Sequence, residues 1–88
     1  MEIELSQRFQ RSFRKLVSKR PETAVIVLQK MLLFSQTPNH KSLALHKLQG
    51  HLKDVWSISV EYDLRILIDF SNPRKPLLVD IGSHNEVY

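Results

Sequence analysis

The sequence predicts an α+β domain in which a helical hairpin packs on one face of a twisted antiparallel sheet, with the element order (β)ααββββ. Apolar residues recur at helical spacing from about residue 7 to residue 35, and from Leu43 onward they alternate in the pattern of strands. The chain of 88 residues is long enough for one modest hydrophobic core, so residues 1–88 are expected to form a single domain. Helices that precede all the main strands favour a fold with the helices on one side of the sheet.

The first half of the chain is predicted to hold two helices joined by a very short connection. Ser6 is a good N-cap residue, and the helix-spaced apolar residues after it predict a helix from about 7 to 19. Pro21 suits the first turn of a second helix, from about 21 to 35, and Glu22 lies near the positive end of its dipole. The short connection favours an antiparallel pair. The apolar stripe of the second helix is expected to comprise Ala24, Val25, Leu28, Met31 and Leu32.

Strand spacing predominates in the rest of the chain. Residues 2 to 5 alternate weakly and are a candidate for a short first strand. The segment Glu61-Tyr62-Asp63 is typical of a tight hairpin, and the Pro-rich segment 71–76 is typical of a longer one. The main strands are predicted near 43–48, 55–60, 64–70 and 77–82.

Alternation assigns the side chains of the last three strands to two faces of the sheet. One set is wholly apolar and is expected to pack on the helices, with Trp56 in the core rather than stacked on a base. The other set mixes apolar and polar residues, and its face is the expected place for a site, because antiparallel sheets often leave one face to solvent. The first set is Trp56, Ile58, Val60, Leu64, Ile66, Ile68, Phe70, Leu77, Val79 and Ile81. The second set is Val55, Ser57, Ser59, Arg65, Leu67, Asp69, Leu78, Asp80 and Gly82.

Basic residues are concentrated in the first predicted helix. The formal net charge is +4, the pI is about 9.7, and no acidic residue lies between residues 8 and 20. Such a stripe favours a polyanion or an acidic protein as partner, although a solvated helix face explains it equally well. The basic residues of this stretch are Arg8, Arg11, Arg14, Lys15, Lys19 and Arg20.

Several classes of protein do not fit this composition. The absence of cysteine excludes disulfides, a thiolate nucleophile and thiolate metal sites, and it fits a cytoplasmic protein. The first residues lack a basic segment followed by an apolar run, so no signal peptide is expected, and no apolar run is long enough to cross a bilayer. The histidines show no metal-site spacing, and neither a metal nor another cofactor is expected.

Residues in the second half of the chain fit cleavage of RNA without a metal. That chemistry needs a base for the ribose 2′-OH, a cation for the phosphate and an acid for the leaving 5′-oxygen. His84, just beyond the last predicted strand, offers an imidazole, which can serve as a base or an acid, and Arg65 offers a guanidinium, whose charge and shape match a phosphate. Simpler roles stay open, with His84 as a surface histidine and Asp63 as a turn residue. Arg65 could equally form a cross-strand ion pair with Asp80 or Asp69.

Four segments of the second half form a distinctive combination: Leu45-His46-Lys47-Leu48-Gln49-Gly50 with Lys53, then Trp56-Ser57-Ile58, then Asp63-Leu64-Arg65-Ile66-Leu67, and finally Asp80-Ile81-Gly82-Ser83-His84-Asn85-Glu86-Val87-Tyr88. Together they resemble the RelE/ParE superfamily of toxins, and most closely its YafQ-like and RelE/StbE-like mRNA interferases. The resemblance implies a toxin of a type II toxin–antitoxin system that enters the ribosomal A site and cuts mRNA, forming a 2′,3′-cyclic phosphate without a metal. It also implies a cognate antitoxin that covers the RNA-binding face.

Carried over residue by residue, the resemblance implies catalytic roles for five side chains. His46 matches the histidine before the Leu-x-Gly turn of YafQ-like toxins, and Asp63 matches their hairpin aspartate. His84 matches the histidine of their carboxy-terminal Gly-Thr-His motif, and Tyr88 matches their terminal aromatic residue. Arg65 matches the strand arginine of RelE.

The chain also departs from the family pattern. Ser59 stands where YafQ-like toxins have a further histidine, and both Ser57 and Ser59 stand where RelE has lysines. Asp80 stands where YafQ-like toxins have an arginine, and its carboxylate is expected to repel RNA. Lys47 and Lys53 are expected to contact RNA phosphates.

The function predicted from the sequence is therefore metal-independent cleavage of mRNA on the ribosome, with an antitoxin as protein partner. The net charge of +4 predicts that the antitoxin segment is acidic and apolar. Two alternatives stay open: a ParE-like toxin of the same fold that acts on DNA gyrase, and a non-catalytic RNA- or protein-binding module whose basic helix is the whole interface. The histidine in the tail favours the nuclease, because poisoning of gyrase needs no general acid or base.

Overall fold

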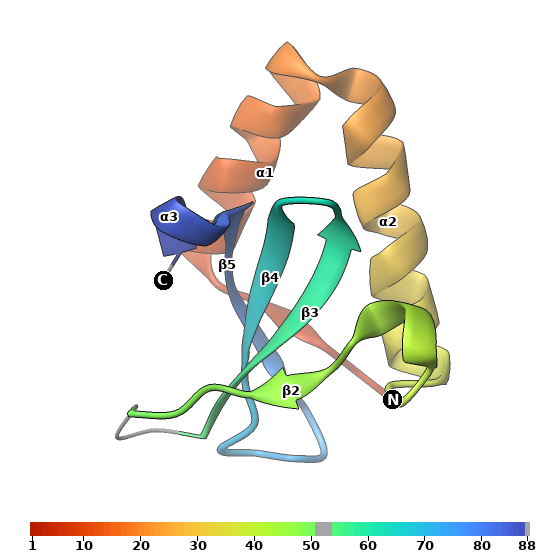
Figure 1. Cartoon of the computed structure of the whole chain (residues 1–88), viewed down its shortest axis with the longest axis vertical. Helices are drawn as coiled ribbons and strands as arrows, with labels where there is room; N and C mark the ends of the chain where they lie inside the picture. The colour runs from red at the N-terminus through yellow and green to blue at the C-terminus, as the bar shows by residue number, and fades with distance from the viewer. Residues whose placement is uncertain (51–53, 88) are drawn as a thin grey trace.

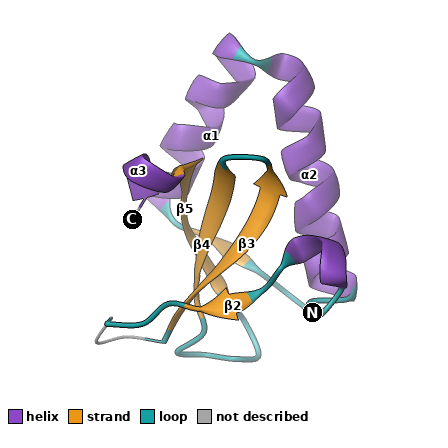
Figure 2. Cartoon of the chain, viewed as in Figure 1, coloured by secondary structure: helices purple, strands orange, loops and turns teal. Residues whose placement is uncertain are grey.

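The computed structural model describes residues 1–50 and 54–87. Two long helices, α1 (Gln7–Lys19) and α2 (Pro21–Gln36), form a hairpin against a five-stranded sheet of order β1-β5-β4-β3-β2, and Figures 1 and 2 show them meeting as an inverted V. None of the described helices is long and apolar enough to span a membrane. The strands are β1 (Glu4–Leu5), β2 (His46–Lys47), β3 (Val55–Glu61), β4 (Leu64–Asp69) and β5 (Leu77–Ser83), and the two short helices are the 3₁₀ helix η1 (Lys41–Leu43) and α3 (His84–Val87).

The predicted fold class, α+β with a helical hairpin on one face of a sheet, is confirmed. The sheet is mixed rather than purely antiparallel, because β1 runs parallel to β5 while the other neighbouring strands are antiparallel. Backbone hydrogen bonds from Glu4 N–H to Pro76 O (2.9 Å) and from Ser6 N–H to Leu78 O (3.0 Å) attach this first strand. The Lys75 ammonium lies 3.1 Å from the Glu4 carboxylate, whose hydrogen bond and charge raise the pKa of Lys75.

Both long helices begin where the sequence predicts, and each start has a local cause. The Ser6 hydroxyl accepts a hydrogen bond from the backbone N–H of Phe9 at 2.9 Å, the contact expected of an N-cap serine. The same hydroxyl donates to the carbonyl oxygen of Val79 at 2.6 Å, so the cap also joins α1 to β5. Helix α2 begins at Pro21, whose fixed φ suits a first helical residue. The single residue Arg20 separates the two helices, which keeps the hairpin tight.

The strand predicted near 43–48 is wrong over most of its length, because β2 covers only His46 and Lys47. Residues 41–43 form η1 instead, and Leu43 is fully buried in the core. Ala44 then adopts the left-handed conformation (φ 48°), which ends the 3₁₀ turn and interrupts the extended run. The other three main strands agree with β3, β4 and β5 to within one residue at each end.

The buried side of α2 differs from the predicted apolar stripe. Val27 and Phe34, which lie outside that stripe, are both fully buried. Ala24 and Met31 of the predicted stripe do pack inward beside them. Apolar residues surround this helix on nearly every side, so their spacing alone does not select the side that the sheet covers. The misassigned residues, exposed at 54%, 52% and 59%, are Val25, Leu28 and Leu32.

A bulge in β5 reverses the predicted alternation of that strand. Leu67 pairs with Asp80 and the next residue, Ile68, pairs with Leu78, which leaves Val79 as the extra residue. Leu78 therefore enters the core, where it is fully buried. The prediction that placed this strand's core side chains at Leu77, Val79 and Ile81 is right only for Ile81.

The hydrophobic core lies between the helical hairpin and the inner face of the sheet. On β3 and β4 the predicted inner residues are confirmed, since Ile58, Ile66 and Ile68 have no exposed surface. The buried core comprises Phe9, Val27, Phe34, Leu43, Ile58, Val60, Leu64, Ile66, Ile68, Leu78 and Ile81.

Replacing the cap serine tests the junction between α1 and β5. Ser6→Ala is expected to lower the free energy of unfolding by about 1–2 kcal/mol, because it removes the N-cap bond and the bond to Val79 together. Ser18→Ala on the exposed surface of the same helix is the matched control and should change stability by less than about 0.5 kcal/mol. Urea unfolding measures both, and equal losses from the two variants would contradict the assigned cap.

Candidate active site

Strand register places two of the predicted site residues, His46 and Arg65, on the sheet face that points away from α1 and α2, which we call the outer face. Ser59 pairs with Arg65 on β4, and Arg65 pairs with Gly82 on its other side. On the edge strand, His46 pairs with Ser57. Directly paired residues of antiparallel strands share a face, so these five residues lie together on the outer face.

The outer face is less open than its sequence indicates. Ser57 is fully buried and Leu67 is only 8% exposed, although both were predicted on a solvated surface. Arg65 is half-buried, whereas His46 and His84 are exposed. These two exposed histidines lie on the edge strand β2 and at the start of α3.

The Arg65 guanidinium is held by the β3–β4 hairpin. Its Nη1 lies 3.1 Å from the carbonyl oxygen of Glu61, 3.3 Å from those of Tyr62 and Leu64, and 3.2 Å from the Ser59 hydroxyl. These contacts replace the cross-strand ion pair that was one reading of the sequence. Nη1 makes all of the guanidinium's hydrogen bonds to the described residues, and Nε and Nη2 make none to them.

The predicted tight hairpin is confirmed, and its tip adjoins the C-terminal segment. Glu61 and Leu64 pair across a two-residue turn in which Asp63 is exposed and Tyr62 is 97% exposed. An ion pair of 3.6 Å between Arg20 and Glu61 ties this turn to the junction of the two long helices. A hollow of about 240 Å³ beside the turn is lined by Arg20, Glu61, Tyr62, Asp63, Leu64, Ser83 and Glu86.

The C-terminal segment forms a helical turn that was not predicted. The Glu86 carboxylate accepts a hydrogen bond from the Ser83 backbone N–H at 2.7 Å, and the Ser83 hydroxyl accepts one from the Glu86 N–H at 3.3 Å. This is a capping box, and the Ser-x-x-Glu spacing is the signal that could have found it. The bond from the Ser83 N–H lowers the pKa of Glu86. A Cβ at Gly82 would lie 3.1 Å from Glu86 Cβ and Val87 Cγ1, so glycine lets α3, which begins with His84, pack on β5.

Of the other predicted site residues, the structure describes the surroundings of His46 and Lys47 but not those of the remaining two. The Nδ1 of His46 lies 3.0 Å from the carbonyl oxygen of Ala44, a contact that favours a proton on Nδ1 and leaves Nε2 as the acceptor. Lys47 pairs with Trp56, so it points away from the outer face, and its ammonium lies 3.6 Å from Asp54. The structure thus separates Lys47 from His46 and Arg65. The remaining predicted residues, Lys53 and Tyr88, lie outside the described part of the chain.

Asp80 is not the exposed carboxylate that the sequence led us to expect. It is 6% exposed and accepts hydrogen bonds from the Ser12 hydroxyl and from the Ile81 N–H, both at 2.8 Å. Arg8 lies 3.0 Å from its second oxygen and offsets its charge. Because the carboxylate is covered and paired, the predicted repulsion of RNA at this position loses its physical basis.

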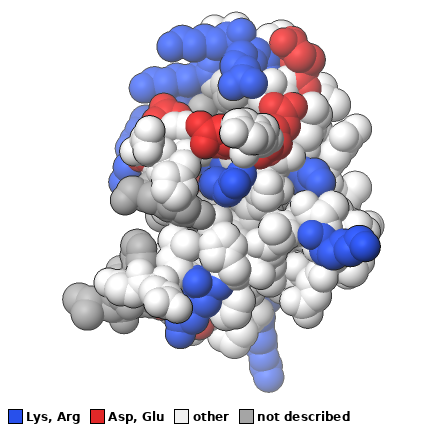
Figure 3. Space-filling model, viewed as in Figure 1, with Lys and Arg blue, Asp and Glu red and all other residues white. Residues whose placement is uncertain are grey.

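Basic side chains gather over α1, at the upper left of the view in Figure 3. Within residues 1–50 and 54–87, Arg8 and Arg20 have carboxylate partners, whereas four basic residues of α1 have no ion pair. The four basic residues of α1 without an ion pair are Arg11, Arg14, Lys15 and Lys19.

In the same described residues, no cluster of three or more His, Asp or Glu side chains could hold a metal ion.

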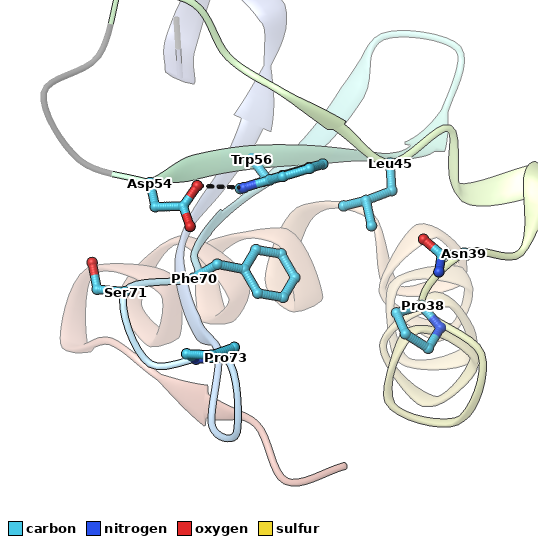
Figure 4. A pocket seen from close by; sticks show the side chains of 8 residues that line it. All are labelled: Pro38, Asn39, Leu45, Asp54, Trp56, Phe70, Ser71 and Pro73. Atoms are coloured by element: carbon cyan, nitrogen blue, oxygen red, sulfur yellow. Dashed lines mark hydrogen bonds between the residues drawn. The ribbon is translucent and has the colours of Figure 1, made fainter.

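A pocket of about 730 Å³ opens on the inner side of the sheet, beyond the end of α2. Figure 4 shows the side chains of Trp56, Phe70 and Leu45 directed into it from different segments. Trp56 was predicted in the core, but it is only half-buried, and its indole N–H donates to Asp54 at 2.7 Å. The lining residues are Pro38, Asn39, Leu45, Asp54, Trp56, Phe70, Ser71 and Pro73.

Comparisons with known proteins establish the fold. No family model and no curated protein sequence matches the chain, but solved structures of bacterial toxins match it over nearly its whole length. YafQ from E. coli has a TM-score of 0.80 at 21% identity, covering 99% of this chain and 97% of that chain. A copper-bound mutant toxin from Helicobacter pylori has a TM-score of 0.81 at 20% identity, covering 100% and 99%. YafQ in the E. coli DinJ–YafQ toxin–antitoxin complex has a TM-score of 0.79 at 22% identity, covering 99% and 96%. The chain therefore has the RelE/YafQ-like toxin fold that the sequence resemblance implied.

The capping box at Ser83 makes a prediction about pH. The pKa of Glu86 in the folded protein is expected below its ordinary value of 4.5, so its contribution to the order of α3 is present above pH 4.5 and is lost as the pH falls through the lowered pKa. The NMR chemical shift of the Ser83 amide proton should follow this titration, and Glu86→Gln should abolish it. A midpoint at or above 4.5 would contradict the capping box.

Proposed function

We propose that this chain is the toxin of a toxin–antitoxin pair and cleaves mRNA on the ribosome. The observation that supports this most directly is the strand register, because it puts Arg65 and His46 on the same face of the sheet, the outer face. The third candidate, His84, begins α3 two residues after Gly82, the residue that pairs with Arg65. A guanidinium for the phosphate and imidazoles for proton transfer are the groups that metal-free RNA cleavage uses. The RelE/YafQ-like fold adds support, because the solved structures that share it are toxins.

The proposed reaction is an internal displacement at phosphorus. One imidazole takes the proton of the ribose 2′-OH, and the 2′-oxygen attacks the adjacent phosphorus to form a 2′,3′-cyclic phosphate. The bond from phosphorus to the 5′-oxygen breaks, and a protonated imidazole gives a proton to that leaving oxygen. We assign the base to His46, because its Nδ1 contact with Ala44 leaves Nε2 as the proton acceptor, and the acid to His84.

Arg65 is assigned to the scissile phosphate. The hairpin carbonyls fix its guanidinium through Nη1, and a guanidinium oriented in advance stabilises developing charge without a cost of reorganisation. Burial of Asp80 against α1 is compatible with the same assignment, because an exposed carboxylate near the RNA would oppose its binding. Asp63 and Tyr88 are given supporting roles, and Lys53 a role in binding RNA, on the family resemblance alone. Lys47 lies on the opposite side of the sheet and is not assigned to the RNA.

An antitoxin is the proposed protein partner. E. coli YafQ, whose fold is similar, occurs in a toxin–antitoxin complex with DinJ. The net charge of +4 and the unpaired cations of α1 favour an acidic partner, because opposite potentials speed and orient association. We therefore expect the protein encoded beside this chain to bind it and to stop its activity.

Toeprinting of programmed ribosomes tests the proposed function. Cuts in the mRNA at defined codon positions would support it. Conversion of relaxed DNA to linear DNA in the presence of gyrase, with no cut in the mRNA, would overturn it in favour of a gyrase-directed toxin. A chain that has neither effect would be a binding module.

His84→Ala is expected to slow cleavage about a hundredfold or more, because one general acid or base commonly contributes about 10² to 10⁴. The free energy of unfolding should change by less than about 0.5 kcal/mol, because the residue is exposed. Single-turnover cleavage on ribosomes and thermal unfolding measure the two effects.

His40→Ala is the matched control for that variant. His40 is also exposed but lies in the segment between α2 and η1, where its ring accepts a hydrogen bond from the Ser42 N–H. Its loss should leave the cleavage rate unchanged. Wild-type cleavage by His84→Ala would remove His84 from the mechanism, and unfolding of that variant would show a structural role.

A further inference from the structure

The pocket of Figure 4 has no part in the proposed cleavage, because it lies on the opposite side of the sheet from the outer face. Trp56 lines the pocket, whereas the next residue of β3, Ser57, belongs to the outer face. Side chains alternate across a strand, so a ligand in the pocket and an RNA on the outer face would contact different sides of the sheet. The pocket therefore points to a ligand other than the RNA substrate.

The pocket is mainly apolar, and its aromatic side chains pack against the hydrophobic core. The rings of Trp56 and Phe70 meet edge to face with centroids 5.6 Å apart, and Phe70 meets the fully buried Phe34 in the same manner at 5.9 Å. The hydrogen bond from the indole N–H to Asp54 further fixes the Trp56 ring. Because these edge-to-face rings continue into the core, the pocket is formed before a ligand arrives. Binding then costs less conformational entropy, since the lining side chains are already ordered.

Three basic residues and two acidic ones lie in the segments that form the pocket: Lys41, Lys47 and Arg74, with Asp54 in the lining and Asp69 hydrogen-bonded to the lining residue Ser71. The lining carboxylate, Asp54, is compensated by the Lys47 ammonium 3.6 Å away. Arg74 directly follows one lining residue, and Lys41 lies two positions after another. Both are exposed, and neither has a carboxylate partner among the residues that the structure describes. The excess of basic over acidic residues in these segments, together with the apolar lining, is complementary to an apolar side chain flanked by carboxylates.

We propose that this pocket is the docking site for an apolar side chain in an acidic segment of the antitoxin. The inference rests on the proposed function, since that function supplies the partner. The RNA substrate is a less suitable occupant, because the pocket lies on the opposite side of the sheet from the residues assigned to cleavage. An apolar side chain seated in a formed pocket at the centre of an interface commonly carries much of the binding energy.

The two faces then have separate tasks. An antitoxin anchored in the pocket holds the toxin through a surface that takes no part in the chemistry. Another part of the antitoxin remains free to cover the outer face. A toxin whose pocket is filled should therefore escape its antitoxin and still cleave mRNA.

Asn39→Phe tests the proposal by filling the pocket from its rim. Asn39 is exposed and makes no side-chain hydrogen bond within the described residues, so the change should not disturb the fold. We expect it to weaken binding of the purified protein encoded by the adjacent gene at least tenfold by titration calorimetry, while cleavage on ribosomes stays at the wild-type rate. Gln29→Phe, which adds the same ring to the exposed surface of α2, is the matched control and should bind as the wild type does.

Arg74→Glu gives a second variant that does not depend on the shape of the pocket. Reversal of a rim charge should weaken binding of the same protein, and more strongly at low salt than at high salt. Trp56 is the only tryptophan of the chain, so its fluorescence reports on the pocket directly. Its emission should shift to shorter wavelength when a tryptophan-free form of the adjacent gene's product binds, because the ring leaves water.

The failures of the two proposals are distinguishable. If the wild-type chain does not cut mRNA on ribosomes, the proposed function is wrong, whatever the pocket binds. If the wild type cuts mRNA and the adjacent gene's product inhibits Asn39→Phe and Arg74→Glu as fully as the wild type, the pocket proposal is wrong. If Asn39→Phe loses ribosome binding instead, with unchanged affinity for that protein, the occupant belongs to the ribosome and the proposal is overturned.

Discussion

The register of the β3–β4 hairpin is the constraint on which both faces of the molecule depend. Pairing of Ile58 with Ile66 puts both side chains in the core, and pairing of Ser59 with Arg65 puts the guanidinium on the outer face. A slip of one residue would exchange the two sets and bury a charge where an isoleucine now packs. The carbonyls of the same hairpin hold Arg65, so the packing of the core and the orientation of the candidate phosphate ligand have one cause.

The bulge at Val79 connects this sheet to the basic helix α1. By placing one extra residue in β5, it lets Leu78 enter the core and sets Asp80 against α1. Asp80 there meets Arg8 and Ser12, and the neighbouring carbonyl of β5 accepts the hydroxyl of the cap residue Ser6. A carboxylate that would oppose RNA if exposed thus stabilises the contact between helix and sheet.

The sheet also separates two kinds of surface. Successive residues of β3 and β2 point to opposite sides, so His46 belongs to the outer face while Lys47 lies beside the aromatic pocket. A protein of this size has few places where a substrate and a regulator can bind without contact between them. Use of both sides of one thin sheet provides two such places, because each strand contributes alternate residues to each.

The sequence by itself determined the fold class, the two long helices, the β3–β4 hairpin and the inner residues of β3 and β4, because these follow from local periodicity, capping and turn chemistry. It also indicated the residue types of the candidate site and that Ser57, Ser59 and Arg65 share a face of the sheet. Only the tertiary structure decided the buried side of α2, the short β2, the bulge of β5, the burial of Asp80 and the position of Lys47 near the pocket. These depend on contacts between segments far apart in the chain, such as Asp80 with Arg8, and a periodic pattern carries no information about such contacts.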